Sequence, residues 1–487
     1  MNKANNLSVL PDDLALNFHL MHPGGDSVPG DPNAAFCLDG TYHLHYILQH
    51  PWQDNRSFCF VHVTSTDMLH WTWQATKLQM SFTGHGMYSG TGFITKEGRP
   101  AVIYHGQGSG RNQIAIAKDN CLSEWQKPYP VEPKMADGKP AQMLHWDPDC
   151  FLIGGTYYAI SGGQNPPLFK SQDLVTWTFV GDFLKHDLPE VAFGEDISCP
   201  NFFRLGNKWM LICISHPFGC RYYLGDWDAE REQFVPQVHG RMNWQRPEQP
   251  LYDTRHADMF APESLLTPDD RRVMWAWFAT LDESINKKTV QSLPRELSLG
   301  ADGSLRIRPL RELESLRREP VTLTELTVTP PECKHGGMAR RRIADLDGDA
   351  FEIKITVDRA EALRKRFGFQ LFAGEDQQGL PLILHPETGT CRIGTTEVPF
   401  SVADLAADED LVLHIFIDKY LVELFASDRQ AAVAVHMDNE AANGLYIYSF
   451  GAPTTIRTVQ IWRLEPANQG FHEARQRPLW EPDIALD

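Results

Sequence analysis

Apolar residues recur along this chain in short runs and do not follow the period of an amphipathic helix. The runs TYHLHYIL (41–48), TYYAISGG (156–163) and RRVMWAWFAT (271–280) are rich in β-branched and aromatic residues, and Gly, Asp, Asn or Pro lie between them and their neighbours. Such runs are typical of short strands joined by turns, and several neighbouring pairs carry hairpin signals. The pattern therefore predicts an all-β protein.

A short motif, S-x-D-x-x-x-W, recurs after several of these runs. It is present as STDMLHW (65–71) and SQDLVTW (171–177), and DNCLSEW (119–125) is a looser version. A repeated unit of about four strands that carries such a motif is typical of a propeller blade. The spacing of the strands also allows a sandwich or a barrel, so these stay open as alternatives.

A boundary between two regions is expected near residues 315–330. A charged segment that contains leucine, LRELESLRREP (310–320), predicts a helix that links two regions. Beyond it, apolar and polar positions alternate again, as in FEIKITVD (351–358), which predicts a second all-β region that we interpret as a sandwich. We therefore expect two domains, residues 1–320 and 321–487, the second of which ends in a polar tail.

Composition and charge argue against several classes of protein. The formal net charge of −18 at pH 7 argues against binding to nucleic acid or to an anionic membrane surface. The chain has neither an apolar window long enough to span a membrane nor the basic and apolar regions of a signal peptide. Its nine cysteines are scattered without a CxxC pair, which indicates free thiols in the cytoplasm. With no metal-binding or nucleotide-binding motif, we expect no metal and no cofactor.

Three acidic positions lie beside turn-forming and aromatic residues. They are Asp31 in GDPNA, Asp147 in HWDPD, and the pair Glu195 and Asp196 in FGEDISCP. In a propeller the innermost strands converge on one axis, so carboxylates that are distant in sequence can meet there. Two carboxylates in one site are the minimum for cleavage of a glycosidic bond. A single Asp-Pro, however, is most often only a turn.

Taken together, these motifs resemble glycoside hydrolase family 32, the family of invertases and levanases. Further stretches in the family's order, such as MFAPESL (259–265) and RIRPLRELESLR (306–317), extend the resemblance over nearly the whole chain. The resemblance implies a five-bladed β-propeller followed by a C-terminal β-sandwich, and retaining cleavage of a β-fructofuranosidic bond. By their match to the family's motifs, Asp31 is expected to be the nucleophile and Asp147 the carboxylate that holds fructose hydroxyls.

The chain departs from the family at the general acid. The family has Glu in a Glu-Cys-Pro motif, and here that position is Ser198, which cannot act as an acid near neutral pH. Glu195 and Asp196 are the nearby candidates. We prefer Glu195 because it has the longer side chain and follows Gly194, where a bulge would turn it inward. Asp196 is the rival because the strand period places it on the same face as Ser198.

Other departures suggest a divergent substrate site. Trp146 replaces an arginine of the family, Glu263 replaces a glutamine, and Gln49 or Ile47 occupies the position of another glutamine. The set of expected substrate-binding residues is Asn33, Gln49, Trp52, His85, Ser89, Trp146, Asp258 and Glu263. For His85 and Ser89, a solvated loop and a plain turn are the competing interpretations.

The expected activity is hydrolysis of sucrose or short fructo-oligosaccharides through a fructosyl-enzyme. A cytoplasmic chain would not meet a fructan polymer, and no cationic cluster near the motifs would pair with a phosphate. The alternatives are a fructosyltransferase that uses a sugar acceptor, a sugar-binding protein without catalysis, and an arabinan-type glycosidase. The expected partner is a small carbohydrate, and the chain is expected to be a monomer or a homodimer.

Overall fold

The computed structural model describes residues 15–24, 30–52, 55–75, 78, 86–243, 257–280, 289–363, 365–376, 379–435 and 442–476. Strands dominate these ranges, which confirms the all-β prediction. The helical elements within them are short: η2 (Arg311–Leu316), α2 (Arg359–Ala362), η3 (Val402–Asp404) and α3 (Gln469–Ala474). None of the helices in the described ranges is long and apolar enough to cross a membrane.

The first part of the chain forms five four-stranded antiparallel sheets, each with its strands in sequence order, as counted over the described residues. The first sheet contains β1 (Pro32–Leu38), β2 (Thr41–Trp52), β3 (Asn55–Ser65) and β4 (Thr72–Gln74). The second contains β5 (Met87–Ile94), β6 (Pro100–Gly106), β7 (Arg111–Ile116) and β8 (Tyr129–Pro130), and the third β9 (Pro148–Ile153), β10 (Thr156–Ser161), β11 (Pro167–Ser171) and β12 (Trp177–Asp182). The fourth contains β13 (Ser198–Leu205), β14 (Lys208–Ser215), β15 (Gly219–Asp228) and β16 (Gln233–Arg241), and the fifth β17 (Ala257–Leu266), β18 (Arg272–Thr280), β19 (Arg295–Leu299) and β20 (Leu305–Pro309).

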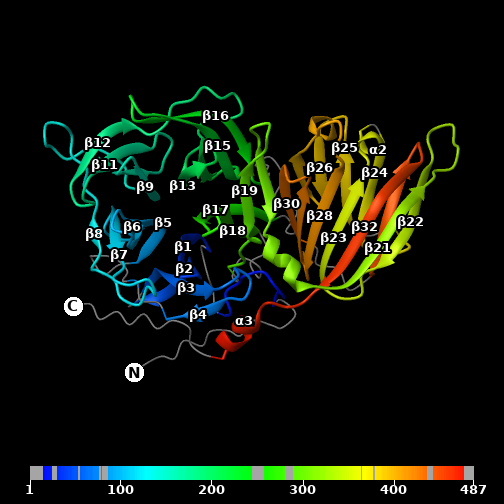
Figure 1. Cartoon of the computed structure of the whole chain (residues 1–487), viewed down its shortest axis with the longest axis horizontal. Helices are drawn as coiled ribbons and strands as arrows, with labels where there is room; N and C mark the ends of the chain where they lie inside the picture. Colours follow the sequence, from blue (N-terminus) through cyan, green and yellow to red (C-terminus); the bar gives the residue numbers. More distant parts are fainter. Residues whose placement is uncertain are drawn as a thin grey trace.

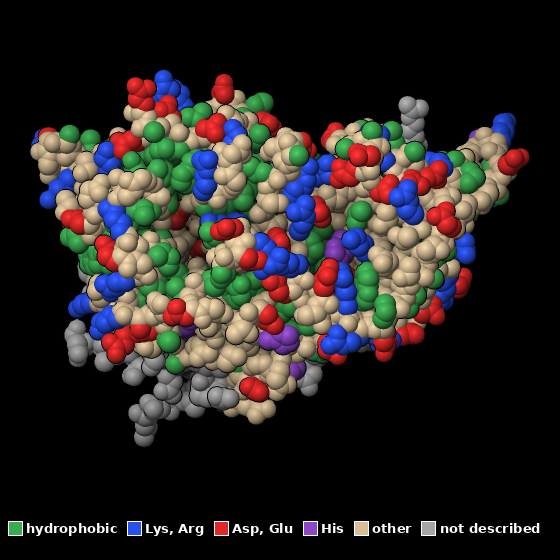
Figure 2. Space-filling model, in the orientation of Figure 1, with side chains coloured by type: hydrophobic (Ala, Val, Ile, Leu, Met, Phe, Trp, Pro, Cys, Tyr) green, Lys and Arg blue, Asp and Glu red, His purple; other side chains and the backbone are tan. Residues whose placement is uncertain are grey.

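The first strand of each sheet lies nearest the centre of this region (Figure 1). There β1 contacts β5 and β17, β9 contacts β5 and β13, and β13 contacts β17. Sequential antiparallel sheets arranged around a common centre fit a β-propeller. Figure 2 shows a hollow near the centre of one face of this region, with acidic side chains in it.

The recurring S-x-D-x-x-x-W motif forms the turn between the third and fourth strands of three sheets. In each copy the leucine or methionine inside the turn has a positive φ: 64° at Met68, 57° at Leu122 and 65° at Leu174. The tryptophan that ends each copy is buried, so it packs the sheets together rather than facing a substrate. Side-chain hydrogen bonds to the turn amides compensate for the strained conformation.

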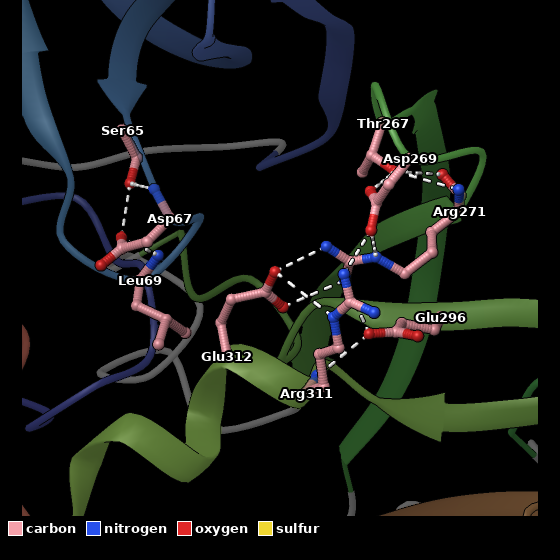
Figure 3. A network of polar contacts seen from close by, with 9 residues as sticks. All are labelled: Ser65, Asp67, Leu69, Thr267, Asp269, Arg271, Glu296, Arg311 and Glu312. Carbon is pink, nitrogen blue, oxygen red and sulfur yellow. Dashed lines mark hydrogen bonds and ion pairs between the residues drawn. The ribbon is translucent and has the colours of Figure 1, made fainter.

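The segment expected to be a linker helix over 310–320 is a shorter 3₁₀ helix, η2, and strand β21 (Arg317–Val328) has already begun at Arg317. The strand begins early because its backbone pairs with β32 (Thr454–Leu464) from Arg317 onward. An ion-pair cluster fastens η2 to the fifth sheet (Figure 3). Arg271 bonds Glu296 at 2.7 Å and Glu312 at 2.6 Å, and the Arg311 side chain bonds Asp269.

The second part of the chain is a sandwich of two six-stranded sheets, with the orders β21-β32-β23-β28-β29-β30 and β22-β31-β24-β25-β26-β27. The remaining strands are β22 (Met338–Asp345), β23 (Ala350–Val357), β24 (Arg366–Ala373), β25 (Leu380–His385), β26 (Thr390–Ile393), β27 (Thr396–Pro399), β28 (Leu411–Asp418), β29 (Leu421–Ala426), β30 (Gln430–Val435) and β31 (Gly444–Phe450). The inner faces of both sheets supply one core, which includes Ile353, Phe369 and Ile447. The alternation seen in the sequence therefore corresponds to buried and exposed faces of these strands.

The sandwich lies against the first region, and a further core cluster contains residues of both. Trp275 and Leu293 pack there with Phe416 and Phe425. The tail returns to the same core cluster, which includes Phe471 of α3. Phe471 is buried and lies edge-on to Trp73, with ring centroids 6.1 Å apart. The described part of the expected polar tail therefore packs back on the body.

Candidate active site

Asp31 lies directly before β1, which begins at Pro32, and a bulge between Pro32 and Ala34 interrupts the pairing of β1 with β2. The Asp31 carbonyl oxygen accepts hydrogen bonds from the Ile47 amide at 2.9 Å and from Asn33 Nδ2 at 2.6 Å. Its carboxylate is buried, and Oδ2 accepts a hydrogen bond of 2.6 Å from Ser89 Oγ. The expected Asp-Pro turn is therefore the start of a bulged strand, and these hydrogen bonds hold the Asp31 carboxylate in place.

Asp147 occupies the equivalent position before β9, and Cys199 contacts both Asp147 and Asp31. The Cys199 amide donates to Asp147 Oδ2 at 3.0 Å, and Cys199 Sγ lies 3.4 Å from the same oxygen. The same sulfur lies 3.9 Å from Asp31 Oδ2. A bulge between Ser198 and Asn201 at the start of β13, with a φ of 45° at Cys199, turns this residue towards both carboxylates. We did not single out Cys199 from the sequence, although its place beside Ser198 in the motif was the available signal.

Burial makes ionisation of both carboxyl groups harder. Loss of hydration raises the pKa of Asp31 to about 6, against the hydrogen bond from Ser89, and the charge of Asp147 adds to the rise. Burial also raises the pKa of Asp147, although hydrogen bonds from Cys199 oppose the rise. Two acidic groups with raised pKa values in one site are a feature that catalytic carboxylates share.

Glu195, which we preferred as the general acid, is in an environment unsuited to a proton donor. Its side chain is fully buried and bonds Arg221 Nη1 at 2.8 Å and Arg241 Nη2 at 2.9 Å. Burial alone would raise its pKa, but the hydrogen bond from Arg241 and the charge of Arg221 hold the pKa below its usual range. The expected inward turn at Gly194 is corrected accordingly, since the bulge of this segment lies at Cys199 and Glu195 faces the arginines.

Asp196 is also held as an anion. Its carboxylate oxygens accept hydrogen bonds from the His216 amide at 2.9 Å and from Ser198 Oγ at 2.8 Å. One of them also pairs with His216 Nδ1 at 2.6 Å. Burial opposes the charge, but these hydrogen bonds lower the pKa of Asp196 to about 2. An acid with so low a pKa carries no proton to donate near neutral pH.

Trp146 and Ser198 connect this segment to the Asp147 turn. Trp146 Nε1 donates a hydrogen bond of 2.9 Å to Ser198 Oγ, and Trp146 as a residue is 39% exposed. The ring is therefore within reach of a ligand, whereas the Ser198 side chain is buried. The two residues that replace the family's charged groups thus bond to each other.

The remaining expected binding residues are placed at different depths. Asn33 is buried and bridges two sheets, because its Nδ2 donates to the Asp31 carbonyl and its Oδ1 accepts from the Gly90 amide at 3.0 Å. Glu263 is buried and accepts a 3.0 Å hydrogen bond from Thr91 Oγ1, and burial raises its pKa well above the usual value. Asp258 is buried and accepts from Asn243 Nδ2 at 2.9 Å. The side chains of these three residues are therefore buried and hydrogen-bonded within the protein.

Gln49 is half-buried on β2, while the alternative Ile47 is fully buried and packs in a core cluster. The side chain of Trp52 and the whole of His85 lie outside the described residues. Ser89 contacts the Asp31 carboxylate directly, whereas Asn33 contacts the Asp31 backbone carbonyl. In the described part of the chain, no group of three or more His, Cys, Asp or Glu residues is arranged to hold a metal ion.

Comparison with known proteins identifies the family. Residues 26–309 match the family described as "Glycosyl hydrolases family 32 N-terminal domain", and residues 312–463 match "Glycosyl hydrolases family 32 C terminal". The raffinose invertase of Escherichia coli is 26% identical over 92% of this chain and 94% of its own. The sucrose-6-phosphate hydrolase of Escherichia coli is 25% identical, with the same two shares.

Solved structures share the fold. The sucrose-6-phosphate hydrolase from Lactobacillus gasseri superposes with a TM-score of 0.71 over 94% of this chain and 95% of that chain, at 19% identity. The fructan 1-exohydrolase IIa from Cichorium intybus superposes with a TM-score of 0.69 over 93% of this chain and 98% of that chain, at 18% identity. With both parts of the chain matched, the protein belongs to glycoside hydrolase family 32 and is a β-fructofuranosidase-like glycoside hydrolase.

Proposed function

We propose that this protein hydrolyses β-fructofuranosidic bonds of sucrose or short fructo-oligosaccharides with retention of configuration. The observation that carries the proposal is the meeting of Asp31 and Asp147 at Cys199, from the starts of two different inner strands. Retaining glycosidases need a nucleophilic carboxylate at the anomeric carbon and stabilisation of an oxocarbenium-like transition state. The two aspartates fit these two roles.

In this mechanism the Asp31 carboxylate attacks the anomeric C2 of fructose and forms a fructosyl-enzyme. Ser89 holds one oxygen, Oδ2, through its 2.6 Å hydrogen bond, so the carboxylate is oriented before substrate arrives. Asp147 accepts hydrogen bonds from fructose hydroxyls and stabilises the positive charge that develops on the ring. Cys199 lies between the two carboxylates and contacts both.

We also propose that the five described four-stranded sheets are the blades of a five-bladed propeller whose axis passes through this site. The neighbour contacts among β1, β5, β9, β13 and β17 support it. The domain limits 1–320 and 321–487 belong to the same proposal. The 3₁₀ helix η2 would then join the propeller to the sandwich.

The proposed substrate is an unphosphorylated sugar. Relatives of this chain are named raffinose invertase and sucrose-6-phosphate hydrolase, so both kinds of substrate occur among them. Arg221 and Arg241 are ion-paired with the buried Glu195, so they are not available to a phosphate. A cytoplasmic enzyme would meet sucrose and short oligosaccharides rather than polymers.

The test is the activity of wild type and Asp31→Asn on sucrose, 1-kestose and sucrose-6-phosphate. We expect the wild type to release equal amounts of glucose and fructose from sucrose, and Asp31→Asn to lose at least about 1,000-fold in kcat, because its amide is a poor nucleophile. Asp39→Asn, in the exposed turn at the other end of β1, is the matched control and should keep wild-type activity. Near wild-type turnover by Asp31→Asn would contradict the mechanism.

Two alternatives give different products. Free glucose in large excess over free fructose would indicate transfer to a sugar acceptor in place of hydrolysis. Sugar binding without turnover would indicate a non-catalytic sugar-binding protein and would contradict the proposal.

A further inference from the structure

The proposed reaction needs a proton donor for the leaving oxygen, and the carboxylates beside Ser198 do not supply one. Glu195 is locked between two arginines, and Asp196 is held as an anion. Ser198 itself is buried and donates its hydroxyl hydrogen to Asp196. The donor must therefore come from another residue near this segment.

His216 is bonded to Asp196 through both its backbone and its ring. It begins the turn between β14 and β15, and this turn lies beside the segment that precedes β13, because Ser198 pairs with Ile214. The His216 amide donates to Asp196 Oδ1 at 2.9 Å, and Nδ1 lies 2.6 Å from Asp196 Oδ2. The side chain is 57% exposed, and its Nε2 has no hydrogen bond to any residue that the structure describes. One ring nitrogen is thus anchored and the other is open to a ligand.

The charges of the two candidate catalytic carboxylates also act on the His216 ring. The hydrogen bond to Asp196 raises the pKa of His216 above its usual value, burial opposes the rise, and the charges of Asp196, Asp147 and Asp31 add to it. In return, the charge of His216 acts on Asp147 to favour its ionised form. The imidazolium is therefore favoured at a pH where Asp31 is ionised.

We propose that His216, oriented by Asp196, is the acid–base catalyst of this enzyme in place of the glutamate that its family carries at Ser198. The inference rests on the proposed function and adds to it the source of the proton. A relay of hydrogen bonds orients the pair: Trp146 Nε1 to Ser198 Oγ at 2.9 Å, and Ser198 Oγ to Asp196 Oδ2 at 2.8 Å. Serine at this position removes a competing carboxylate and supplies the hydroxyl that holds Asp196.

Each step balances with His216 as donor and acceptor. In the first step, Asp31 forms a bond to C2 as the bond from C2 to the glycosidic oxygen breaks, and His216 Nε2 gives its proton to that oxygen. The leaving sugar departs as a neutral alcohol, and His216 becomes neutral. In the second step, Nε2 takes a proton from water, whose oxygen bonds to C2 as the ester to Asp31 breaks. The imidazolium and the Asp31 carboxylate are restored.

The test compares leaving groups in His216→Gln. Sucrose needs protonation of its leaving oxygen, whereas a nitrophenyl β-fructofuranoside releases a stable phenolate without it. We expect kcat/KM for sucrose to fall by about 100- to 10,000-fold, and kcat/KM for the aryl fructoside to fall by less than about tenfold. Loss of the base slows hydrolysis of the fructosyl-enzyme, so kcat for the aryl fructoside should fall. Added azide, which needs no base, should restore this kcat and yield a fructosyl azide.

Two more variants separate catalysis from structure. Asp196→Asn keeps the shape but removes the negative charge beside the ring, so the alkaline limb of the pH profile for kcat/KM should move to lower pH. His70→Gln is the matched control, because His70 Nδ1 pairs with Asp67 Oδ2 at 2.7 Å and its amide donates to Asp67 Oδ1 at 2.9 Å, in a turn away from the site. The His70→Gln variant should keep the wild-type kcat/KM on both substrates and the wild-type pH profile.

The outcomes distinguish this inference from the function beneath it. If His216→Gln keeps its activity on both substrates while Asp31→Asn is inactive, the role of His216 is overturned and the proposed function stands. A second result would also overturn the role of His216. In it, folded His216→Gln loses activity equally on both substrates, azide has no effect, and the pH profile of Asp196→Asn does not move. That result would assign the pair of His216 and Asp196 a structural role. A wild type inactive on both fructosides would instead refute the proposed function.

Discussion

At the scale of single residues, the site concentrates acidic groups that are costly to ionise. Asp31 and Asp147 are both buried, and each receives hydrogen bonds that only partly offset the lost hydration. Buried carboxylates of this kind lower the free energy of unfolding, because the folded chain must hold a charge in surroundings that disfavour it. Sites with such groups are typical of catalysis, in which stability is given up for activity. The arginine-paired Glu195 is the opposite case, since its charge is fully compensated.

This difference predicts how stability depends on pH. The folded-state pKa of Asp31, about 6, lies above its ordinary value of 3.8, so the folded protein loses stability from this group as pH rises through that interval. Asp31→Asn should therefore be more stable than wild type at pH 7.5 by about 1–3 kcal/mol, and the gain should shrink towards pH 4.5. Urea unfolding at the two pH values, with Asp39→Asn as control, measures it. A destabilised variant at pH 7.5 would contradict the cause that we assign to the raised pKa.

At the scale of elements, two local devices position the chemistry. The bulge at the start of β13 aims the backbone and thiol of Cys199 at the carboxylates, and a strand without it would continue the plain alternation. The S-x-D turn closes the outer hairpins: Asp67 Oδ1 accepts hydrogen bonds from Ser65 Oγ at 2.9 Å and from the Leu69 amide at 3.0 Å (Figure 3). Sequence spacing identifies the second device, because all its partners lie within a few residues.

The turn predicts a graded effect of substitution at Asp67. Asp67→Asn keeps an oxygen that accepts from the turn amides, whereas Asp67→Ala leaves these amides without that partner. We expect Asp67→Ala to lower the free energy of unfolding by about 1–2 kcal/mol and Asp67→Asn to lower it by less than half as much. Chemical denaturation of both variants, together with an unchanged kcat on sucrose, provides the check. Equal losses in the two variants would indicate that the hydrogen bonds are not what stabilises the turn.

At the scale of the whole molecule, a buried charge network joins the segment around His19, the fifth sheet and the sandwich. Asp418 Oδ2 accepts from the His19 amide at 3.0 Å and pairs with His19 Nδ1 at 2.9 Å. His19 Nε2 lies 3.1 Å from Glu423 Oε1, and Arg295 bonds the other oxygen of Glu423 at 2.6 Å. Burial opposes the charge on His19, but the hydrogen bonds to Asp418 and Glu423 raise its pKa to about 9.

This network should hold the two regions together most strongly below neutral pH. Since the folded-state pKa of His19 is above the unfolded value of 6.5, its contribution is fully present below pH 6.5 and is lost as pH rises through about 9. His19→Gln should lower stability by about 3 kcal/mol at pH 6 and by clearly less at pH 9.5. Thermal unfolding at both values measures this, with the exposed His472→Gln as control. A loss that does not change with pH would show that packing and not charge is what the substitution removes.

The sequence by itself determined the β class, the family and the turn motif, because alternation and turn chemistry are local and the family's motifs keep their order. It did not determine which nearby group acts as the acid. Glu195 and Asp196 are adjacent in sequence, yet one faces Arg221 and Arg241, from strands β15 and β16, and the other faces His216 after β14. Those partners lie 20 to 46 residues away along the chain, so only the folded sheet decides what surrounds each carboxylate and therefore its charge.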